Sequence, residues 1–354
     1  MKESPRFFTS DSKDNNLPQN ILCSLCPNNC SIQNGKFGIC GIRGNKGGKA
    51  LIPYYGHITA LALDPIEKKP LYHFMPASSI LSLGFSGCNL HCPFCQNWHI
   101  SRNPDAEGKF ISPEDVISLV LREKSDAPPS IAYTYSEPLV HAEYLLDCMS
   151  MSHKHGIANV LVTNGCINAD AASEILSLTD AANIDLKSFS AETYSKILGG
   201  NLDAVIRFIK LAHAKNVHIE LTTLVVPELN DSQEELDSIA QFIAGLSSET
   251  DPVAHNSVIP WHLSAYHPAY NWNTPPTDTN LLLRTAERAR KILPYVYAGN
   301  IPAEENDTHC LSCGAVLVHR RGYKVDTSGL LPPAGTEKYY KCRGCGEAVP
   351  IIYR

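Results

Sequence analysis

The sequence lacks three features that would assign it to a specialised class of protein. No apolar run approaches the roughly 18 to 20 residues that span a bilayer, so we expect no membrane segment. Residues 1–20 are polar and contain no apolar core, which predicts a disordered tail and no secretory signal. The net charge of −6 over 354 residues gives no basic signature, which argues against nucleic-acid binding by bulk electrostatic attraction.

Cysteine, in contrast, is abundant. Thirteen cysteines occur in the 354-residue chain, whereas oxidised secreted scaffolds are usually short. Eleven of them fall into groups of four, three and four, and Cys148 and Cys166 stand apart. This grouping predicts metal or iron–sulfur ligation in a reducing compartment, and therefore a cytoplasmic protein.

Strand and helix patterns alternate from about residue 78 and predict an α/β fold. The expected strands are SILSLGFSG, SIAYTYSEP, NVLVTNG, ANIDLKS, VHIELTTLVVP, SVIPWHLSAYHP and YVYAGNI. Six strand–helix units and a last strand favour a partial (β/α)6 TIM-like barrel with parallel strands. We therefore divide the chain into a Cys-rich segment with a hairpin (21–77), the barrel (78–305) and a C-terminal ribbon (306–354).

Polar residues gather at or just after the predicted carboxyl ends of these strands. Barrels of this kind carry their chemistry at that end. The residues concerned are Cys88, Glu137, Thr163, Asn164, Asp185, Lys187 and His267.

The loop GCNLHCPFCQNWHIS holds three cysteines, Cys88, Cys92 and Cys95, and lacks a fourth. Three thiolates can hold three irons of a four-iron cubane and leave the fourth iron with an open coordination position. An open iron can chelate a substrate through its amino and carboxylate groups. The alternatives are a zinc loop or three unrelated cysteines.

With this Cys-x3-Cys-x2-Cys loop, the region from Ser78 to about Ile301 resembles the radical S-adenosylmethionine (SAM) superfamily. The resemblance implies a [4Fe–4S] cluster and SAM as cofactors. It implies reductive cleavage of SAM to methionine and a 5′-deoxyadenosyl radical, which abstracts a hydrogen atom from a substrate. Because no flavin or ferredoxin module is evident, we predict an external low-potential electron donor, a flavodoxin or ferredoxin.

Further motifs match this superfamily and imply cofactor-binding residues. YSEP stands where members place a Gly-Gly-Glu-like turn, whose acid receives the methionine ammonium group. VTNG, IDLKS and a late Tyr-His are similar to segments of pyruvate formate-lyase activating enzymes, in which the Asp-x-Lys pair serves the cofactor. The residues implied are Ser136, Glu137, Thr163, Asn164, Asp185, Lys187 and His267.

Two four-cysteine groups flank the barrel. Paired CxxC knuckles predict a structural zinc ribbon, with rubredoxin-like iron as the alternative, at Cys310, Cys313, Cys342 and Cys345. The N-terminal group can close either a structural zinc site or an auxiliary four-iron cluster, at Cys23, Cys26, Cys30 and Cys40.

From about Ile21 onward, CSLCPNNC, DPIEKKPLYHF and PWHLSAYHP look like the AmmeMemoRadiSam-system radical enzyme, a relative of the pyruvate formate-lyase activases. This resemblance implies association with Memo-like and AMMECR1-like proteins and leaves the substrate unassigned. One alternative is an activase that makes a glycyl radical on a partner enzyme. Another is a non-catalytic metal-binding scaffold, and the ribbon also permits a tRNA substrate.

Overall fold

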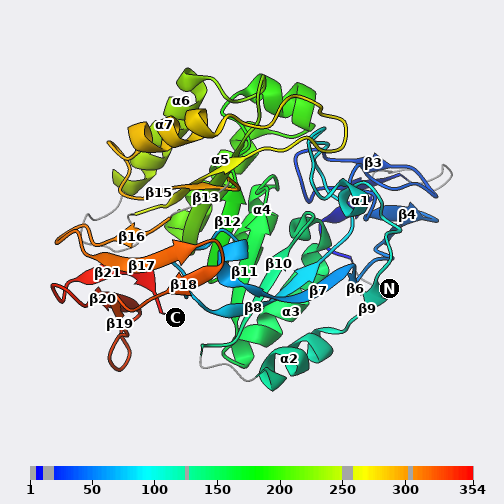
Figure 1. Ribbon diagram of the computed structural model, residues 1–354. Coiled ribbons are helices and arrows are strands. Elements are labelled where there is room, and N and C mark those ends of the chain that lie inside the picture. The colour runs from blue at the N-terminus through cyan, green and yellow to red at the C-terminus, as the bar shows by residue number, and fades with distance from the viewer. Residues whose placement is uncertain (1–4, 11–19, 124–126, 249–257, 302–305, 354) are drawn as a thin grey trace.

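The computed structural model describes residues 5–10, 20–123, 127–248, 258–301 and 306–353. Its centre is an eight-stranded sheet in the order β15-β14-β13-β12-β11-β10-β8-β7 (Figure 1). Seven strands are parallel and match the seven predicted segments: β8 (Ser79–Gly84), β10 (Ser130–Thr134), β11 (Ala158–Thr163), β12 (Ala181–Asp185), β13 (His218–Val225), β14 (Trp261–Ala265) and β15 (Val296–Gly299). The sheet is open between β15 and β7, as expected of a partial barrel.

The eighth strand, β7 (Ala60–Pro65), pairs antiparallel with β8 and forms an edge of the sheet. The predicted barrel boundary at residue 78 therefore excluded one strand of the main sheet. Its Leu61 and Leu63 side chains are 45% and 52% exposed, so β7 does not have the buried face that marks the other strands.

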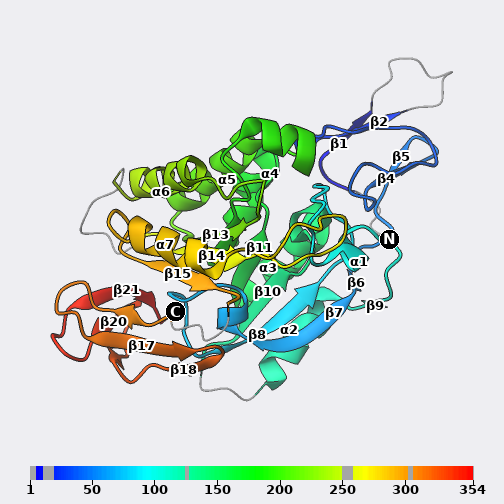
Figure 2. The same cartoon turned by 45° about the horizontal axis from the view of Figure 1, so that its top comes forward.

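Helices connect the parallel strands and cover the outer face of the sheet (Figures 1 and 2). The Ser112 hydroxyl accepts a hydrogen bond from the Asp115 N–H at 3.1 Å and caps the amino end of α2 (Pro113–Arg122). The helices are α1 (Trp98–Ser101), α2 (Pro113–Arg122), α3 (Ala142–Lys154), α4 (Ala169–Leu176), α5 (Leu202–Ala214), α6 (Gln233–Ser248) and α7 (Thr279–Ala289), with shorter turns η1 (Ile66–Lys68), η2 (Pro138–His141) and η3 (Thr193–Leu198). Among the described residues, no helix combines the length and apolar character needed to cross a bilayer.

Residues 66–78, which link β7 to β8, cover the amino-terminal end of the sheet, and we call them the closing segment. Its Leu71, Phe74 and Met75 pack with residues that begin the strands, such as Ala158 and Ala181. Burial of this apolar surface stabilises the closure by about 25 cal/mol per Å². The carboxyl end of the sheet therefore remains the accessible one.

Glu220 of β13 fixes this closing segment. Its carboxylate is fully buried and accepts the N–H groups of Tyr72 at 3.0 Å and His73 at 2.7 Å. The His218 and His262 rings lie 3.0 and 2.6 Å from the same carboxylate. Burial opposes its charge, but the two histidines outweigh this and hold the pKa of Glu220 well below its usual range.

The N-terminal segment forms small sheets beside the barrel: β1 (Phe8–Ser10), β2 (Ile21–Cys23), β3 (Ser31–Ile32), β4 (Gly44–Lys46), β5 (Lys49–Leu51), β6 (His57–Ile58) and β9 (Lys109–Phe110). The prediction of a disordered tail is wrong for Phe8–Ser10, because these residues pair antiparallel with β2. Other parts of that tail, residues 1–4 and 11–19, lie outside the described residues.

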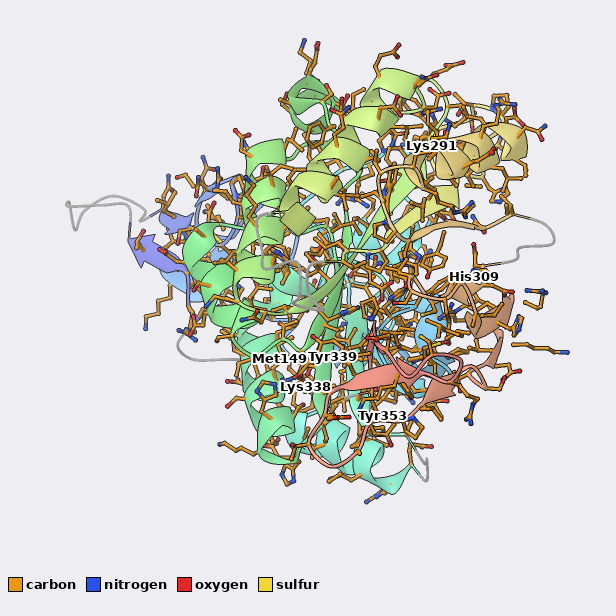
Figure 3. The ribbon with its side chains drawn as sticks, turned by 90° about the vertical axis from the view of Figure 1, so that its left-hand side faces the viewer. Met149, Lys291, His309, Lys338, Tyr339 and Tyr353 are labelled. Carbon is orange, nitrogen blue, oxygen red and sulfur yellow. The ribbon has the colours of Figure 1, made fainter. Side chains whose placement is uncertain are left out.

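The C-terminal module consists of β16 (Thr308–His309), β17 (Val316–Arg321), β18 (Lys324–Asp326), β19 (Leu330–Leu331), β20 (Tyr339–Cys342) and β21 (Ala348–Ile352). The Tyr353 N–H donates to the Lys338 carbonyl oxygen at 2.8 Å and joins the chain end to the start of β20 (Figure 3). His73 of the closing segment holds this module, because its Nδ1 lies 2.9 Å from the Pro350 carbonyl oxygen. The two flanking Cys-rich parts lie at opposite sides of the barrel (Figures 1 and 2).

Candidate functional site

The three-cysteine loop follows β8 at the carboxyl end of the sheet. Gly87 has φ +78°, a left-handed conformation that turns the chain just before Cys88. Hydrogen bonds fix the loop: the His91 N–H donates to the Leu198 carbonyl oxygen at 2.7 Å. The Leu90 N–H lies 3.4 Å from the Cys88 sulfur. These hydrogen bonds hold the loop just after its first ligand, Cys88.

The three thiols are spread more widely than one metal ion requires. Among the described residues, the ribbon cysteines are the one group of three or more ligand atoms that all lie within 4.8 Å of one another. Burial raises the pKa of Cys92 to about 11 and holds that of Cys88 well above its usual value, so both thiols need a bound metal to ionise near neutral pH. The spread of the sulfurs is wider than a single zinc ion needs and is compatible with ligands on separate irons of a cluster.

A cavity of about 340 Å³ opens beside the three thiols and is lined by residues from the ends of several strands. Its volume falls within the range of small-ligand sites. Nine of the ten residues predicted for the cluster and the cofactor line it, namely Cys88, Cys92, Cys95, Ser136, Glu137, Thr163, Asn164, Asp185 and Lys187. The tenth is His267, described below.

The buried hydroxyl of Ser136 is one feature of this cavity that fits a polar ligand. It has no hydrogen-bond partner in the structure, and the Thr222 hydroxyl, which also lines the cavity, has none either. Buried polar groups in proteins are normally hydrogen-bonded, so each such hydroxyl calls for a ligand or water. The cavity thus combines the three thiols with polar groups that can bind a polar cofactor.

The comparisons with known proteins bear on this geometry. The radical SAM superfamily model matches residues 83–243. An uncharacterized protein of Methanocaldococcus jannaschii is 35% identical over 342 residues, which cover 94% of this chain and 96% of that protein. The chain belongs to the radical SAM superfamily.

Radical SAM activating enzymes also appear among its relatives. The pyruvate formate-lyase-activating enzyme of Clostridium pasteurianum is 27% identical over 184 residues, covering 50% of this chain and 73% of that enzyme. The pyruvate formate-lyase 1-activating enzyme of Escherichia coli K12 is 25% identical over 191 residues, covering 52% of this chain and 74% of that enzyme. Membership in the superfamily implies a [4Fe–4S] cluster and SAM, and the chain is an enzyme of this class.

Glu137, which lines the cavity beside the three thiols, is engaged within the protein. Its carboxylate accepts hydrogen bonds from the Thr163 hydroxyl at 2.7 Å and from the N–H groups of Asn164 at 2.8 Å and Leu139 at 3.0 Å. Burial raises its pKa to about 7 against these hydrogen bonds. Glu137 therefore joins the ends of β10 and β11 as well as lining the cavity.

Asp185 and Lys187 lie together at the end of β12, where the Lys187 ammonium donates to the Asp185 carboxylate at 2.7 Å. Burial opposes the charge on Lys187, but Asp185 and the nearby Cys92 thiol raise its pKa above the usual range. Lys187 thus remains a cation at the wall of the cavity, where an anionic ligand group would be stabilised.

His267 lies apart from this cavity. It is exposed and lines a neighbouring cavity of about 570 Å³, where its Nε2 is 3.3 Å from the Asn300 carbonyl oxygen. The two cavities share Lys68, Thr222 and Ser264, so they adjoin. The β14 strand ends at Ala265, and the chain turns outward before His267.

Lys69 is not among the site residues predicted from the sequence. It is 1% exposed and lines the first cavity. Its ammonium donates to Asp64 at 2.8 Å and lies 4.5 Å from the centre of the Tyr135 ring. Burial opposes ionisation of Asp64, but Lys69 and Tyr135 hold its pKa well below the usual range. No local pattern marks Lys69, because its burial depends on Tyr135 as well as on Asp64.

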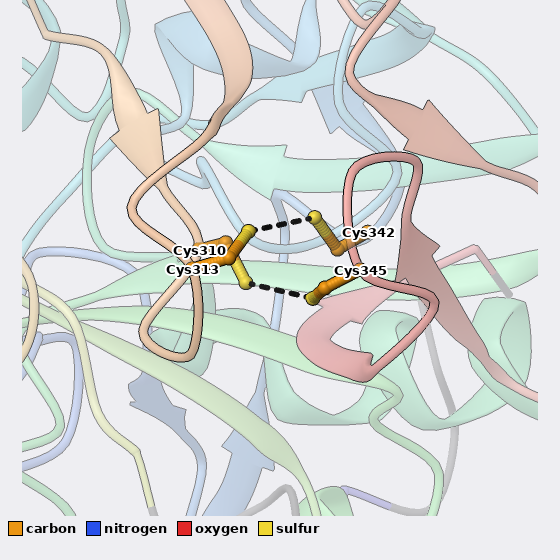
Figure 4. Close-up of side chains that lie close together, drawn as sticks. All are labelled: Cys310, Cys313, Cys342 and Cys345. Atoms are coloured by element: carbon orange, nitrogen blue, oxygen red, sulfur yellow. Dashed lines mark hydrogen bonds between the residues drawn. The ribbon is translucent and has the colours of Figure 1, made fainter.

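The four ribbon cysteines form a compact group at the far side of the barrel. The sulfur of Cys310 is 3.8 Å from that of Cys345, and Cys313 is 3.7 Å from Cys342 (Figure 4). Slight burial opposes ionisation of Cys310, but hydrogen bonds from the backbone of Cys313 and Ser312 lower the pKa of its thiol to about 7. A zinc ion with Zn–S bonds of about 2.3 Å holds tetrahedral thiolates about 3.8 Å apart, so the group fits zinc.

Proposed function

We propose that this protein is a radical SAM enzyme whose [4Fe–4S] cluster is held by Cys88, Cys92 and Cys95, with SAM in the adjoining cavity. When bound, the cluster and SAM supply a 5′-deoxyadenosyl radical that abstracts hydrogen from a substrate. One observation carries the proposal: three partly buried thiols share a cavity with polar side chains, among them the Ser136 and Thr222 hydroxyls, which lack hydrogen-bond partners. An external flavodoxin or ferredoxin would supply the electron.

The chain's own residues have separable roles in this proposal. Lys187 would receive the methionine carboxylate, and Asp185 would hold Lys187 or accept a ribose hydroxyl, since both line the cavity. The Ser136 hydroxyl would donate to a polar group of SAM. Glu137 would hold the turn at Thr163 and Asn164 in place through its hydrogen bonds, and its carboxylate would also contact the methionine ammonium group.

Reductive SAM cleavage tests this function. We expect the anaerobically reconstituted protein, reduced with dithionite, to convert SAM to 5′-deoxyadenosine and methionine in equal amounts. Quantification of both products by chromatography measures the reaction. A protein with a filled four-iron site that yields neither product would contradict the proposal.

A second candidate function is activation of a glycyl-radical enzyme, which the similarity to pyruvate formate-lyase activating enzymes favours. A glycine-centred radical signal on a partner enzyme, after incubation with SAM and reductant, would support it. The alternative that follows from the wider resemblance is a substrate handled with Memo-like and AMMECR1-like proteins. Product formation that depends on these partners, without a glycyl radical, would distinguish the two.

The flanking parts complete the proposal. The C-terminal module would hold structural zinc at Cys310, Cys313, Cys342 and Cys345, since the sulfur spacing suits one ion. All thirteen cysteines are free of disulfides, which supports a cytoplasmic location.

A further inference from the structure

The N-terminal cysteines converge on a third candidate metal site. Cys23 ends β2, and its N–H donates to the Cys30 carbonyl oxygen at 2.9 Å. The turn that carries Cys40 closes tightly, because a Cβ at Gly38 would lie 3.3 Å from the Cys30 sulfur. Cys23, Cys26 and Cys30 share one short loop, and the contact at Gly38 brings the turn that carries Cys40 against that loop.

The spacing of these thiols separates them from the ribbon group. A single zinc ion needs thiolates about 3.8 Å apart, which the ribbon provides. No three of the N-terminal thiols lie within 4.8 Å of one another in the described part of the chain. A four-iron cubane takes one thiolate at each of four separate irons and so needs a wider set. The N-terminal group therefore fits a cluster better than an ion.

A buried arginine stands beside this group. The Arg43 Nε donates to the Cys23 sulfur at 3.3 Å, and its other two nitrogens donate to Glu143 of α3 at 2.7 and 2.9 Å. Both side chains are 1% exposed. A hydrogen bond from a cation to a ligand sulfur stabilises the more reduced cluster and raises its potential. Arg43 thus links the cysteine group to α3 of the barrel, and it lies where it can change the reduction potential of a bound cluster.

The N-terminal group also contacts the three-cysteine loop directly. A Cβ at Gly87 would lie 2.6 Å from the Cys40 carbonyl oxygen and 2.3 Å from Ile42, so only glycine permits this approach. The Asn28 side chain donates to the Asn89 carbonyl oxygen at 3.0 Å on the other side of Cys88. The first ligand of the loop is therefore flanked on both sides by contacts with the N-terminal cysteine segment.

We propose that Cys23, Cys26, Cys30 and Cys40 hold an auxiliary [4Fe–4S] cluster that relays electrons to the cluster of the three-cysteine loop. In each relay step the auxiliary cluster is oxidised from the 1+ to the 2+ state and the loop cluster is reduced from 2+ to 1+, and no covalent bond changes. A low-potential one-electron donor protein reduces the auxiliary cluster again. The relay rests on the proposed function, whereas the four irons at the N-terminal site do not.

Metal counts test the site itself. We expect about eight irons and eight sulfides per chain in anaerobically reconstituted wild type, and about four of each in Cys88→Ser/Cys92→Ser/Cys95→Ser and in Cys26→Ser/Cys30→Ser. Zinc should stay at one per chain. The triple variant should keep a reduced-cluster spin-resonance signal that SAM leaves unchanged. About four irons with two zinc ions in wild type, or an iron-free triple variant, would overturn the site.

Two further variants test the relay and give readouts besides activity. Arg43→Lys should shift the midpoint potential of the signal that remains in the triple variant. Cys26→Ser/Cys30→Ser should cleave SAM with dithionite but lose cleavage driven by reduced ferredoxin, and Cys148→Ser, which removes a buried thiol outside all three groups, should retain both. If Cys26→Ser/Cys30→Ser loses SAM cleavage with both reductants, or keeps it with both, the relay is overturned. A wild type with both clusters and no cleavage by dithionite would instead contradict the proposed function.

Discussion

The three-cysteine loop and the C-terminal ribbon use the same ligand atom in two different surroundings. Ribbon sulfurs lie 3.7 to 3.8 Å apart, and Cys313 and Cys345 are exposed. Loop sulfurs are spread apart, partly buried and directed at a cavity that other strands line. A metal that only stabilises the fold has all its coordination positions filled by protein ligands. A reactive metal keeps one position open, with polar groups nearby to bind the substrate.

Removal of a loop ligand should have the largest effect and tests the comparison most directly. We expect Cys92→Ala to abolish 5′-deoxyadenosine formation and to lose about four irons per chain, because a cubane with two ligands is not retained. Product assay and iron analysis measure both losses. Cys345→Ser in the ribbon is the matched control and should keep the loop iron. Equal iron loss in the two variants would abolish the distinction between the regions.

Loss of ribbon metal should instead unfold one module. Structural zinc contributes about 10 kcal/mol or more to the folding of small zinc domains, so Cys342→Ser should unfold residues 306–353 and leave the barrel folded. Limited proteolysis with mass spectrometry should find new cleavage sites confined to that range, together with zinc loss. A protease-resistant ribbon without zinc would contradict the structural role.

Much of this architecture could be predicted because it depends on local patterns. Seven buried strands read as apolar runs, and parallel topology brings their carboxyl ends together, so motif residues at those ends had to share a site. The sequence placed β7 in the hairpin before the barrel and not in the main sheet, because its Leu61 and Leu63 are exposed and give it no buried apolar face.

The remainder of the site depends on contacts between distant segments. Lys69 is buried only because Asp64 and Tyr135 surround it, and no local pattern encodes Tyr135 as a neighbour. His267 follows a strand end, as the motif residues do, yet it lies in the adjoining cavity because the chain turns outward there. The spread of thiols that separates a cluster from a zinc site is likewise a three-dimensional property.

Substitution of Glu220 tests the contact between the barrel and the closing segment, which in turn holds the ribbon. Glu220→Gln should destabilise the protein by about 3–5 kcal/mol, because it removes a buried charge that is paired with two histidines and holds the closing segment. Chemical denaturation monitored by fluorescence measures the change, with exposed Glu234→Gln as the control.

The pH dependence of that stability has a defined sign. The pKa of Glu220 is depressed in the folded state, so its contribution is present above the unfolded value of 4.5 and is lost as the pH falls below it. Wild type should therefore lose more stability than Glu220→Gln between pH 5 and more acidic conditions, about 1.4 kcal/mol for each unit of depression. Parallel stability curves for the two proteins would show that Glu220 is not ionised in the fold.

Substitution of Lys187 should give the smallest effect. It tests which side chain binds SAM beside the iron that lacks a thiolate ligand. Hydrogen bonds to charged groups contribute about 1.5–3 kcal/mol, so Lys187→Met should weaken SAM binding by about tenfold to a hundredfold. Iron content should be unchanged, because Lys187 is not a ligand. Lys196→Met is the matched control, since Lys196 is 72% exposed and pairs with Glu192 on the surface. If Lys187→Met binds SAM as tightly as the control, the methionine carboxylate lies elsewhere, and Lys69, the other buried lysine of the cavity, becomes the cation to test.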